Sequence, residues 1–282
     1  MEYRELDHQK VLDLLPDRNP WAHKGDFGKI LLLCGSRGYT GAAALAAMGA
    51  LRSGAGLVYL GVPEEIYAIE AVKLTEPIVF PLPCKDGMLS VDAIPKILEL
   101  LPKMDAVLIG PGLGQSQGTL SVLKTVLREF SGFVVVDADG INLLSRHKHL
   151  LRGRTGATVL TPHDGEFIRL AGSLGADRSG EAMSLARELD CILLLKGHET
   201  LITDGQIVWR NRTGNPGMAV GGSGDALAGI LVSLIGQGLE PLTATAVAAW
   251  LHGAAGDACA AKLGQYGMLP TDFLQELPRL MK

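Results

Sequence analysis

Apolar residues in this chain fall into short continuous runs separated by longer stretches in which they recur at helical spacing. A short apolar run bounded by glycine or polar residues is typical of a strand buried on both faces, and a spacing of three or four residues is typical of a helix. The pattern predicts strands at residues 29–34, 57–62, 78–80, 105–109, 133–136, 158–161 and 191–195. It predicts helices at residues 7–15, 42–52, 64–73, 91–101, 117–130, 180–189, 226–237, 242–262 and 270–281, with a further helix beginning near Pro162.

The order of these elements predicts an α/β fold. Strands and helices alternate from residue 29 to 195, so we expect a largely parallel sheet covered on both faces, a three-layer α/β/α sandwich. Residues 191–211 break the alternation, because Asp204-Gly205 reads as the turn of a β-hairpin at an antiparallel edge. No linker, repeat or low-complexity segment interrupts the chain, so residues 1–282 are expected to form one domain.

Composition narrows the function classes. Apolar residues make up 47% of the 282 residues, enough for a large core, and the net charge of −4 is spread without a basic stripe, which argues against a nucleic-acid partner. The apolar tract 242–261 is interrupted by His252 and Asp257, so we interpret it as a buried helix and expect no membrane association. The N-terminus lacks a signal-peptide pattern, and four scattered cysteines fit free thiols in the cytoplasm: Cys34, Cys84, Cys191 and Cys259.

The stretch Gly214–Asp225, with the sequence GNPGMAVGGSGD, is the clearest candidate for chemistry. Its glycines and proline exclude a regular element, and an apolar helix begins directly after it. A glycine-rich loop that opens a helix presents free N–H groups at the positive end of the helix dipole, where phosphate binds. Asp225 stands at this junction. It is either a helix cap or a general base that accepts a proton from an attacking hydroxyl while the amides hold a phosphoryl group.

Other polar motifs follow the expected strands. Residues 35–41 and Gly110-Pro-Gly-Leu-Gly114 are glycine turns at strand ends, where ligands bind in open α/β folds, although the first could be only a tight connection. Asp137 and Asp139 could hold a metal or cap the next helix. His252, alone on an apolar helix, is interpreted as structural and outside the site.

Two further motifs each leave two interpretations open. His163 and Glu166 lie three residues apart on one helix face, so they either cap that helix or contact substrate and a phosphate-bound Mg²⁺. Lys196 follows a strand and precedes a glycine, which suits a phosphate contact, although an exposed lysine is often only solvated.

These motifs resemble a known family. GNPGMAVGGSGDALAG, HKGDFGKILLLCGSRGYTGAA, GPGLG, TPHDGEF and KGHET are similar to the blocks of the ADP/ATP-dependent (S)-NAD(P)H-hydrate dehydratases, in the ribokinase-like superfamily, across residues 19–265. Val220 departs from the family, which usually has Thr or Ser there. The resemblance implies substrate contacts at Ala42, Ala43, Gly112, Gly114, His163 and Asp225. It implies nucleotide contacts at Lys196, Gly197, His198, Glu199, Thr200, Gly222, Ser223 and Gly224, and a metal-side role for Glu166.

The resemblance implies repair of hydrated NADH or NADPH. ADP or ATP would phosphorylate the C6 hydroxyl of the S-form with the help of Mg²⁺, and phosphate would then leave, giving AMP or ADP. Asp225 would be the base. The resemblance further implies a homo-oligomer, which is a tetramer in the family. It also implies a separate NAD(P)H-hydrate epimerase, since fewer than twenty residues precede the first matched block.

Two alternatives stay open. A ribokinase-like kinase of the hydroxyethylthiazole or hydroxymethylpyrimidine type would share the anion site and base but release a phosphorylated product. A nucleotide-sensing module would bind ADP or ATP without turnover. The sequence does not separate ADP from ATP, or NADH-hydrate from NADPH-hydrate.

Overall fold

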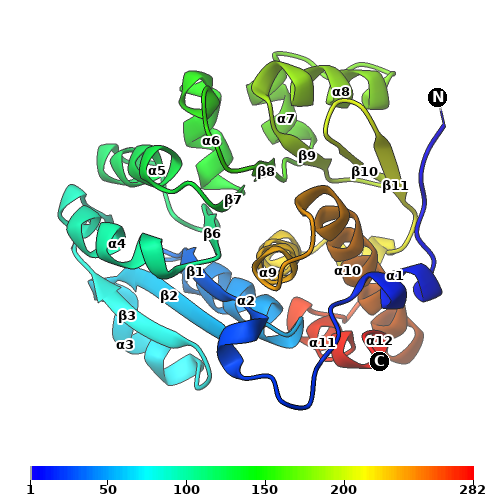
Figure 1. Cartoon of the computed structure of the whole chain (residues 1–282), viewed down its shortest axis with the longest axis horizontal. Helices are drawn as coiled ribbons and strands as arrows, with labels where there is room; N and C mark the ends of the chain where they lie inside the picture. The colour runs from blue at the N-terminus through cyan, green and yellow to red at the C-terminus, as the bar shows by residue number, and fades with distance from the viewer. Residues whose placement is uncertain (1) are drawn as a thin grey trace.

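A nine-stranded sheet forms the centre of the computed structural model, which describes residues 2–282 (Figure 1). The strand order is β11-β10-β9-β8-β7-β6-β1-β2-β3. The neighbouring strands from β9 through β8, β7, β6, β1 and β2 to β3 are all parallel. Strand β10 is antiparallel to both β9 and β11. The strands are β1 Lys29–Leu33, β2 Leu57–Pro63, β3 Ile78–Leu82, β6 Ala106–Ile109, β7 Phe133–Val136, β8 Thr158–Leu160, β9 Ile192–Leu195, β10 Thr200–Thr203 and β11 Val208–Asn211, with a separate small hairpin of β4 Cys84–Lys85 and β5 Met88–Leu89. The predicted parallel sheet with an antiparallel edge is confirmed.

Helices cover both faces of the sheet, as Figure 1 shows. They are α1 His8–Leu14, α2 Thr40–Arg52, α3 Glu64–Lys73, α4 Ile94–Leu100, α5 Gln117–Glu129, α6 Asp139–Ser145, α7 Asp164–Ala171, α8 Arg178–Leu189, α9 Ser223–Gly236, α10 Pro241–Leu263, α11 Pro270–Leu274 and α12 Leu277–Leu280. Short 3₁₀ turns are η1 Lys24–Phe27, η2 Val91–Ala93, η3 Leu101–Lys103, η4 Lys148–Leu151 and η5 Pro216–Met218. Among residues 2–282, no helix is both long enough and apolar enough to cross a lipid bilayer.

Alternation along each strand divides the core in two. On β1, Ile30 and Leu32 face the cluster that contains α2, α9 and α10, while Leu31 and Leu33 face the cluster that contains α4 to α8. Successive strand residues point to opposite faces, so a run that is apolar throughout can bury both. This is why the sheet needs helices on two sides.

Several predicted boundaries shift. Helix α2 begins at Thr40 rather than after it, with Tyr39 as its N-cap. The expected helix at 270–281 is two short helices, and the helix α6 at Asp139–Ser145 was not predicted. The cysteines are all free, and three are buried while Cys84 is only partly so.

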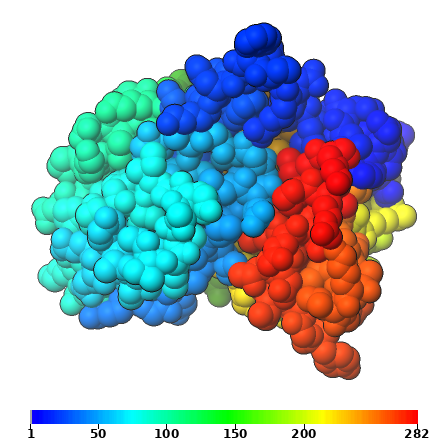
Figure 2. Space-filling view, turned by 90° about the horizontal axis from the view of Figure 1, so that it is seen from below, coloured from blue at the N-terminus to red at the C-terminus, as the bar shows by residue number. Residues whose placement is uncertain are grey.

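Helix α1, near the N-terminus, lies against the C-terminal part of the chain, as the blue and red segments of Figure 2 show. The ring of His8 stacks on Trp250 of α10, with centroids 5.4 Å apart. Its Nε2 lies 2.9 Å from the carbonyl of Leu280. The N-terminal segment therefore packs on α12 and on α10, and α10 also lines the site described below.

Helix α9 packs very closely against α2. A Cβ on Gly229 would come within 2.1 Å of the Ala46 carbonyl oxygen, and one on Gly49 within 2.5 Å of the Ala226 carbonyl oxygen. The two backbones can approach this closely only because both positions are glycine. This contact holds the first turn of α9 at the carboxyl edge of the sheet.

Candidate active site

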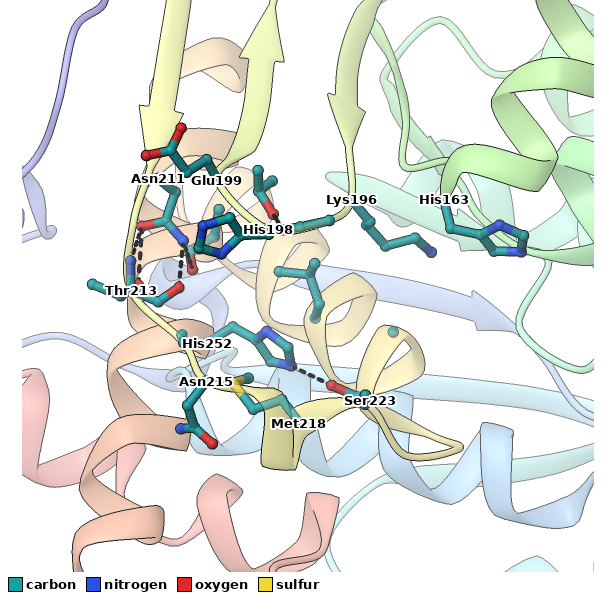
Figure 3. A pocket seen from close by; sticks show the side chains of 18 of the residues that line it. His163, Lys196, His198, Glu199, Asn211, Thr213, Asn215, Met218, Ser223 and His252 are labelled. Carbon is teal, nitrogen blue, oxygen red and sulfur yellow. Dashed lines mark hydrogen bonds between the residues drawn. The ribbon is translucent and has the colours of Figure 1, made fainter. Parts of the chain in front are cut away.

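A cavity of about 1000 Å³ opens at the carboxyl edge of the sheet, between the ends of β7 and β9, the segment from β11 to α9, and helix α10 (Figure 3). Parallel strands end at one edge, so segments far apart in sequence meet there. The predicted residues that line the cavity are His163, Glu166, Lys196, Gly197, His198, Glu199, Thr200, Ser223, Gly224 and Asp225.

The glycine-rich loop that enters α9 is fixed from both sides. Asp257 of α10 accepts hydrogen bonds from the Gly214 N–H at 2.8 Å and the Asn215 Nδ2 at 2.9 Å. Gly222 is the N-cap, with a φ of 94°. Helix geometry leaves the N–H groups of the first turn without intrahelical acceptors, so those of Gly224 and Asp225 are free to bind an anion.

Asp225 is the third residue of α9, so the capping interpretation is wrong. Its carboxyl lines the cavity. Burial raises its pKa from 3.8 to about 6, and the charge of Asp137 adds to the rise while Lys196 opposes it. A carboxyl with a pKa just below neutrality is ionised at pH 7 and is still a useful proton acceptor.

Lys196 follows β9 and forms an ion pair with a buried carboxylate. Its Nζ lies 2.9 Å from Asp137 Oδ1 and 3.9 Å from Glu166 Oε2. Burial by itself lowers the pKa of Lys196, but the two carboxylates outweigh it and the pKa is raised. The ammonium group is therefore charged at neutral pH and stands at the floor of the cavity.

Asp137 and Asp139 are not helix caps, because α6 has Ala138 at its N-cap. Asp137 Oδ1 accepts hydrogen bonds from Lys196 Nζ and from Thr161 Oγ1 at 2.7 Å, and its buried Oδ2 has no partner among residues 2–282. Asp139 accepts the Gly114 N–H at 2.9 Å, so it holds the GPGLG turn.

His163 and Glu166 do cap α7, in a reciprocal arrangement. His163 Nδ1 accepts the Gly165 N–H at 3.0 Å, and Glu166 Oε2 accepts the His163 N–H at 2.9 Å. Both also line the cavity, so the capping and functional interpretations are compatible. The His163 side chain is half exposed, and in Figure 3 its ring points away from the Lys196 side chain.

Across residues 2–282 no three His, Cys, Asp or Glu side chains group as a metal site. Mg²⁺ takes one or two carboxylates together with substrate phosphates and keeps several waters. The unpartnered Asp137 Oδ2 and the nearby Glu166 carboxylate could supply these one or two protein ligands. These residues fit a cation that enters with a nucleotide, and not one held by protein alone.

His252 of α10 lines the cavity, so the prediction that it lies outside the site was wrong. Its Nε2 is 3.3 Å from Ser223 Oγ, and Figure 3 shows the two side chains pointing toward each other. Burial lowers its pKa to about 4, so the ring is neutral at pH 7. Its apolar helix carried no signal for this role, because only the packing of α10 against α9 brings the ring to Ser223. The sequence reasoning also missed Asn211, and it did not single out Asn215 and Met218 within the glycine-rich stretch; all three line the same cavity.

The remaining predicted residues do not line this cavity: Ala42, Ala43, Gly112, Gly114 and Gly222. Most of them gather at the ends of β1 and β6. Gly112 packs so tightly on α2 that a Cβ there would lie 2.8 Å from the Ala42 Cβ, and the Gly112 carbonyl accepts a hydrogen bond from Ser36 Oγ at 2.7 Å. The side chain of Ala43 is fully buried.

Asp225 interacts electrostatically with Asp139, beside this second group. The charge of Asp139, which holds the Gly114 turn, also raises the pKa of Asp225. The pKa of Asp225 therefore depends on charges of the cavity and on the charge of Asp139.

A sequence profile of the NAD(P)H-hydrate dehydratases matches residues 30–279. The chain belongs to this family. The bifunctional NAD(P)H-hydrate repair enzyme Nnr of Moorella thermoacetica is 46% identical over 275 residues, which cover 95% of this chain and 52% of that enzyme. The ADP-dependent (S)-NAD(P)H-hydrate dehydratase of Listeria monocytogenes is 32% identical over 270 residues, covering 95% of this chain and 92% of that enzyme. The chain therefore spans about half the length of the bifunctional relatives it matches.

Solved structures of the family have the same fold. The ADP/ATP-dependent NAD(P)H-hydrate dehydratase of Bacillus subtilis, co-crystallised with ATP and Mg²⁺, superposes with a TM-score of 0.86 at 30% identity, covering 99% of this chain and 98% of that one. A hydroxyethylthiazole kinase from Pyrococcus horikoshii reaches a TM-score of 0.59 at 20% identity, over 84% of this chain and 91% of that one. The second likeness extends to the ribokinase-like fold alone.

Proposed function

We propose that this chain, acting as one domain of residues 1–282, dehydrates the S-form of hydrated NADH or NADPH at the expense of ADP or ATP. The observation that carries the proposal is the position of Asp225: its carboxyl lines the cavity, its pKa is raised to about 6, and it follows an anion-binding helix start. The close similarity to the repair enzymes supports the substrate. The products would be the restored cofactor, phosphate, and AMP or ADP.

Asp225 accepts the proton of the C6 hydroxyl as that oxygen attacks the terminal phosphorus of the nucleotide, and the bond from this phosphorus to its bridging oxygen breaks to release AMP or ADP. The new C–O–P group then breaks at its C–O bond, because the ring nitrogen supplies electrons and phosphate leaves far more easily than hydroxide. The electron pair of the C–O bond departs with phosphate. A final proton loss from the ring restores the dihydronicotinamide.

The first turn of α9 and Lys196 stabilise the charge that develops on the phosphoryl oxygens. In the predicted segment Gly222–Gly224 the Ser223 N–H already donates to the Val220 carbonyl at 3.3 Å. The N–H groups of Gly224 and Asp225 are free and already oriented, so no reorganisation is needed when the charge appears. A well-aimed donor of this kind contributes about 3 kcal/mol. The loop Lys196–Thr200, which lines the same cavity, would hold the nucleotide.

His252 is proposed to position Ser223. A neutral imidazole 3.3 Å from the hydroxyl can fix its rotamer and direct its remaining hydrogen-bonding capacity toward the nucleotide phosphates. The ring itself is held against Phe273, with centroids 5.3 Å apart. His252 therefore acts through Ser223 and not on the reacting atoms.

The second group of residues is proposed as the nicotinamide side of the site. Ala42, Ala43, Gly112 and Gly114 would contact the substrate through backbone and His163 through its ring, with Asp225 between the two ligands. Mg²⁺, when bound with the nucleotide, neutralises phosphate charge, and Asp137 and Glu166 are the residues that would hold it, directly or through water.

The decisive experiment is incubation with hydrated NADH plus ADP, and separately plus ATP, while recovery of the reduced cofactor and free phosphate is measured. Recovery of both supports the dehydratase and ranks the two donors. A stable phospho-alcohol from a thiazole or pyrimidine alcohol, without cofactor recovery, would instead establish the kinase. Tight nucleotide binding without turnover of any of these would establish the nucleotide-sensing module.

Three wider features belong to the same proposal: a cytoplasmic location, a homo-oligomer such as a tetramer, and cooperation with an NAD(P)H-hydrate epimerase. The bifunctional repair enzymes among the relatives support the last of these. Light scattering on the purified chain tests the oligomer.

A further inference from the structure

A second cavity, of about 370 Å³, lies at the opposite edge of the sheet from the site described above. It is formed where α5 ends, where β7 begins, and by the segment from η4 to β8. Its charged and polar lining consists of Arg128, His149, Arg152 and Arg154, the hydroxyl residues Ser131 and Thr155, and one carboxylate, Glu129. None of these residues takes part in the proposed dehydration.

Positive charge is concentrated around this cavity. Residues 124–154 contain six Lys or Arg and three Asp or Glu, in a chain whose net charge is −4. Two of the three acids, Asp137 and Asp139, are at the other edge of the sheet, where β7 ends. Burial lowers the pKa of His147, and the neighbouring positive charges of Lys124, His149 and Arg146 lower it further.

Most of these cations have no counter-charge. Lys148 pairs with Glu188 at 2.7 Å, but in the described chain no carboxylate lies within 4.0 Å of the basic groups of Lys124, Arg128, Arg146, Arg152 or Arg154. Surface cations elsewhere are commonly paired, as Lys96 is with Glu99 at 2.8 Å. Exposed arginines that line a cavity without a partner are available to a ligand.

Arg154 is the fixed part of the cavity wall. Its guanidinium donates to the carbonyls of Leu127, Phe130 and Gly132 at 2.6 to 3.0 Å, and to Thr158 Oγ1 at 2.9 Å. Burial lowers its pKa, because no carboxylate compensates the desolvated charge. An arginine has five N–H donors, so one on Nη2 remains after these four bonds.

We propose that this cavity binds a phosphate group carried by a small molecule. Guanidinium groups match phosphate oxygens in paired hydrogen bonds, and Arg128 and Arg152 are exposed enough to close on a ligand from two sides of the fixed Arg154. The volume is near the lower end of small-molecule sites, about 300–1000 Å³. It suits inorganic phosphate, diphosphate or a nucleoside monophosphate and not a dinucleotide.

The test is hydrogen–deuterium exchange of the full chain with inorganic phosphate, diphosphate or AMP, each compared with sodium chloride at equal ionic strength. We expect slower exchange in peptides covering 127–131 and 149–156, and the three ligands rank the accepted source of the phosphate group. The double variant Arg128→Ala/Arg152→Ala should weaken this protection at least ten-fold in ligand concentration and leave dehydration unchanged.

The matched control is Arg52→Ala/Lys85→Ala, which removes the same charge from exposed positions outside both cavities. It should keep the protection. The proposal would be overturned if none of the ligands slowed exchange in those peptides. It would also be overturned if the protection survived in the Arg128/Arg152 variant, or if the control variant lost it equally. None of these three results bears on the proposed dehydratase, whose residues lie at the other edge.

Discussion

At the scale of single residues, the site holds Asp225 where its charge is disfavoured. Burial and the carboxylate of Asp137 raise the pKa from 3.8 to about 6, so the folded protein binds this proton more tightly than the unfolded chain. Ionising the group therefore costs folding free energy above pH 6, and this cost is absent below about pH 4. The same property makes the carboxylate basic enough to accept a proton.

Replacing Asp225 by Asn should separate these two effects. We expect turnover to fall about 10²–10⁴-fold, since general base catalysis contributes that much. Nucleotide affinity should remain, and at pH 8 the unfolding free energy should rise by about 1–3 kcal/mol, an increase that fades as pH falls from 6 to 4. Denaturant unfolding at both pH values and steady-state kinetics measure this. Near wild-type dehydration by the variant would remove the assignment of the base.

The pH dependence of the wild-type enzyme follows from the same carboxyl. The proposed mechanism requires ionised Asp225, so kcat/KM should rise as pH increases through about 6 and then level off. Lys196 has a raised pKa, so no loss of its charge is expected near neutrality. A profile from pH 5 to 9 checks this. An acid limb centred near pH 4 would contradict the role given to burial.

His252 is expected to act through Ser223. His252→Phe and Ser223→Ala should each lower kcat about 10-fold, and the double variant should lose little more, because coupled residues are not additive. His252→Gln, which can still hydrogen-bond the hydroxyl, should recover part of the rate. Additive losses in the double-mutant cycle would show that the ring only fills space.

At the scale of elements, the start of α9 is held in place by glycine contacts with α2. Gly229→Ala would put a Cβ 2.1 Å from the Ala46 carbonyl oxygen, and neither helix backbone can yield without losing this contact. We expect a loss of about 1–3 kcal/mol in unfolding free energy, the usual cost of overpacking. Thermal unfolding gives the measurement.

Gly41→Ala is the control on the same pair of helices. Gly41 lies in α2, and a Cβ there meets nothing within 4 Å. Alanine has the better helix propensity, so this variant should be unchanged or more stable by up to about 1 kcal/mol. Equal destabilisation by both substitutions would mean that close approach is not what the glycine at 229 provides.

At the scale of the whole molecule, the cavity joins β7, β9, β11, α9 and α10, so a bound nucleotide should stabilise the entire fold. Ligand at 100 times its Kd adds about 2.7 kcal/mol to the unfolding free energy. We expect ADP to raise the Tm of wild type and Asp225→Asn alike. Lys196→Met should lower the stability of the free protein and also reduce the shift in Tm that ADP causes.

The exposed Lys85→Met is the control for this substitution and should keep the full ADP-induced shift. Thermal scans with and without ADP compare the four proteins. A full shift in Lys196→Met would show that the lysine does not contact the nucleotide. It would leave the ion pair with Asp137 as a structural feature of the sheet edge.

Local pattern was enough for much of this protein. Apolar runs and helical spacing identified the strands of the sheet, because a strand buried on both faces must be apolar throughout. The motifs also predicted Asp225, His163 and Lys196 as site residues, and all three line the cavity. For Asp225 the reason was local, because a glycine-rich loop before a helix leaves free N–H groups that can bind an anion. The resemblance supplied the family and the division into two ligand sides.

Tertiary structure alone decided the rest. It paired Asp137 with Lys196 across 59 positions and brought His252 of α10 to Ser223 of α9. It also separated Ala42 and Gly112 from the main cavity. A sequence determines which residues must be buried and where the backbone can turn, since these depend on near neighbours. Distances between side chains and the pKa of a carboxyl depend on packing between distant segments, and only the folded chain sets those.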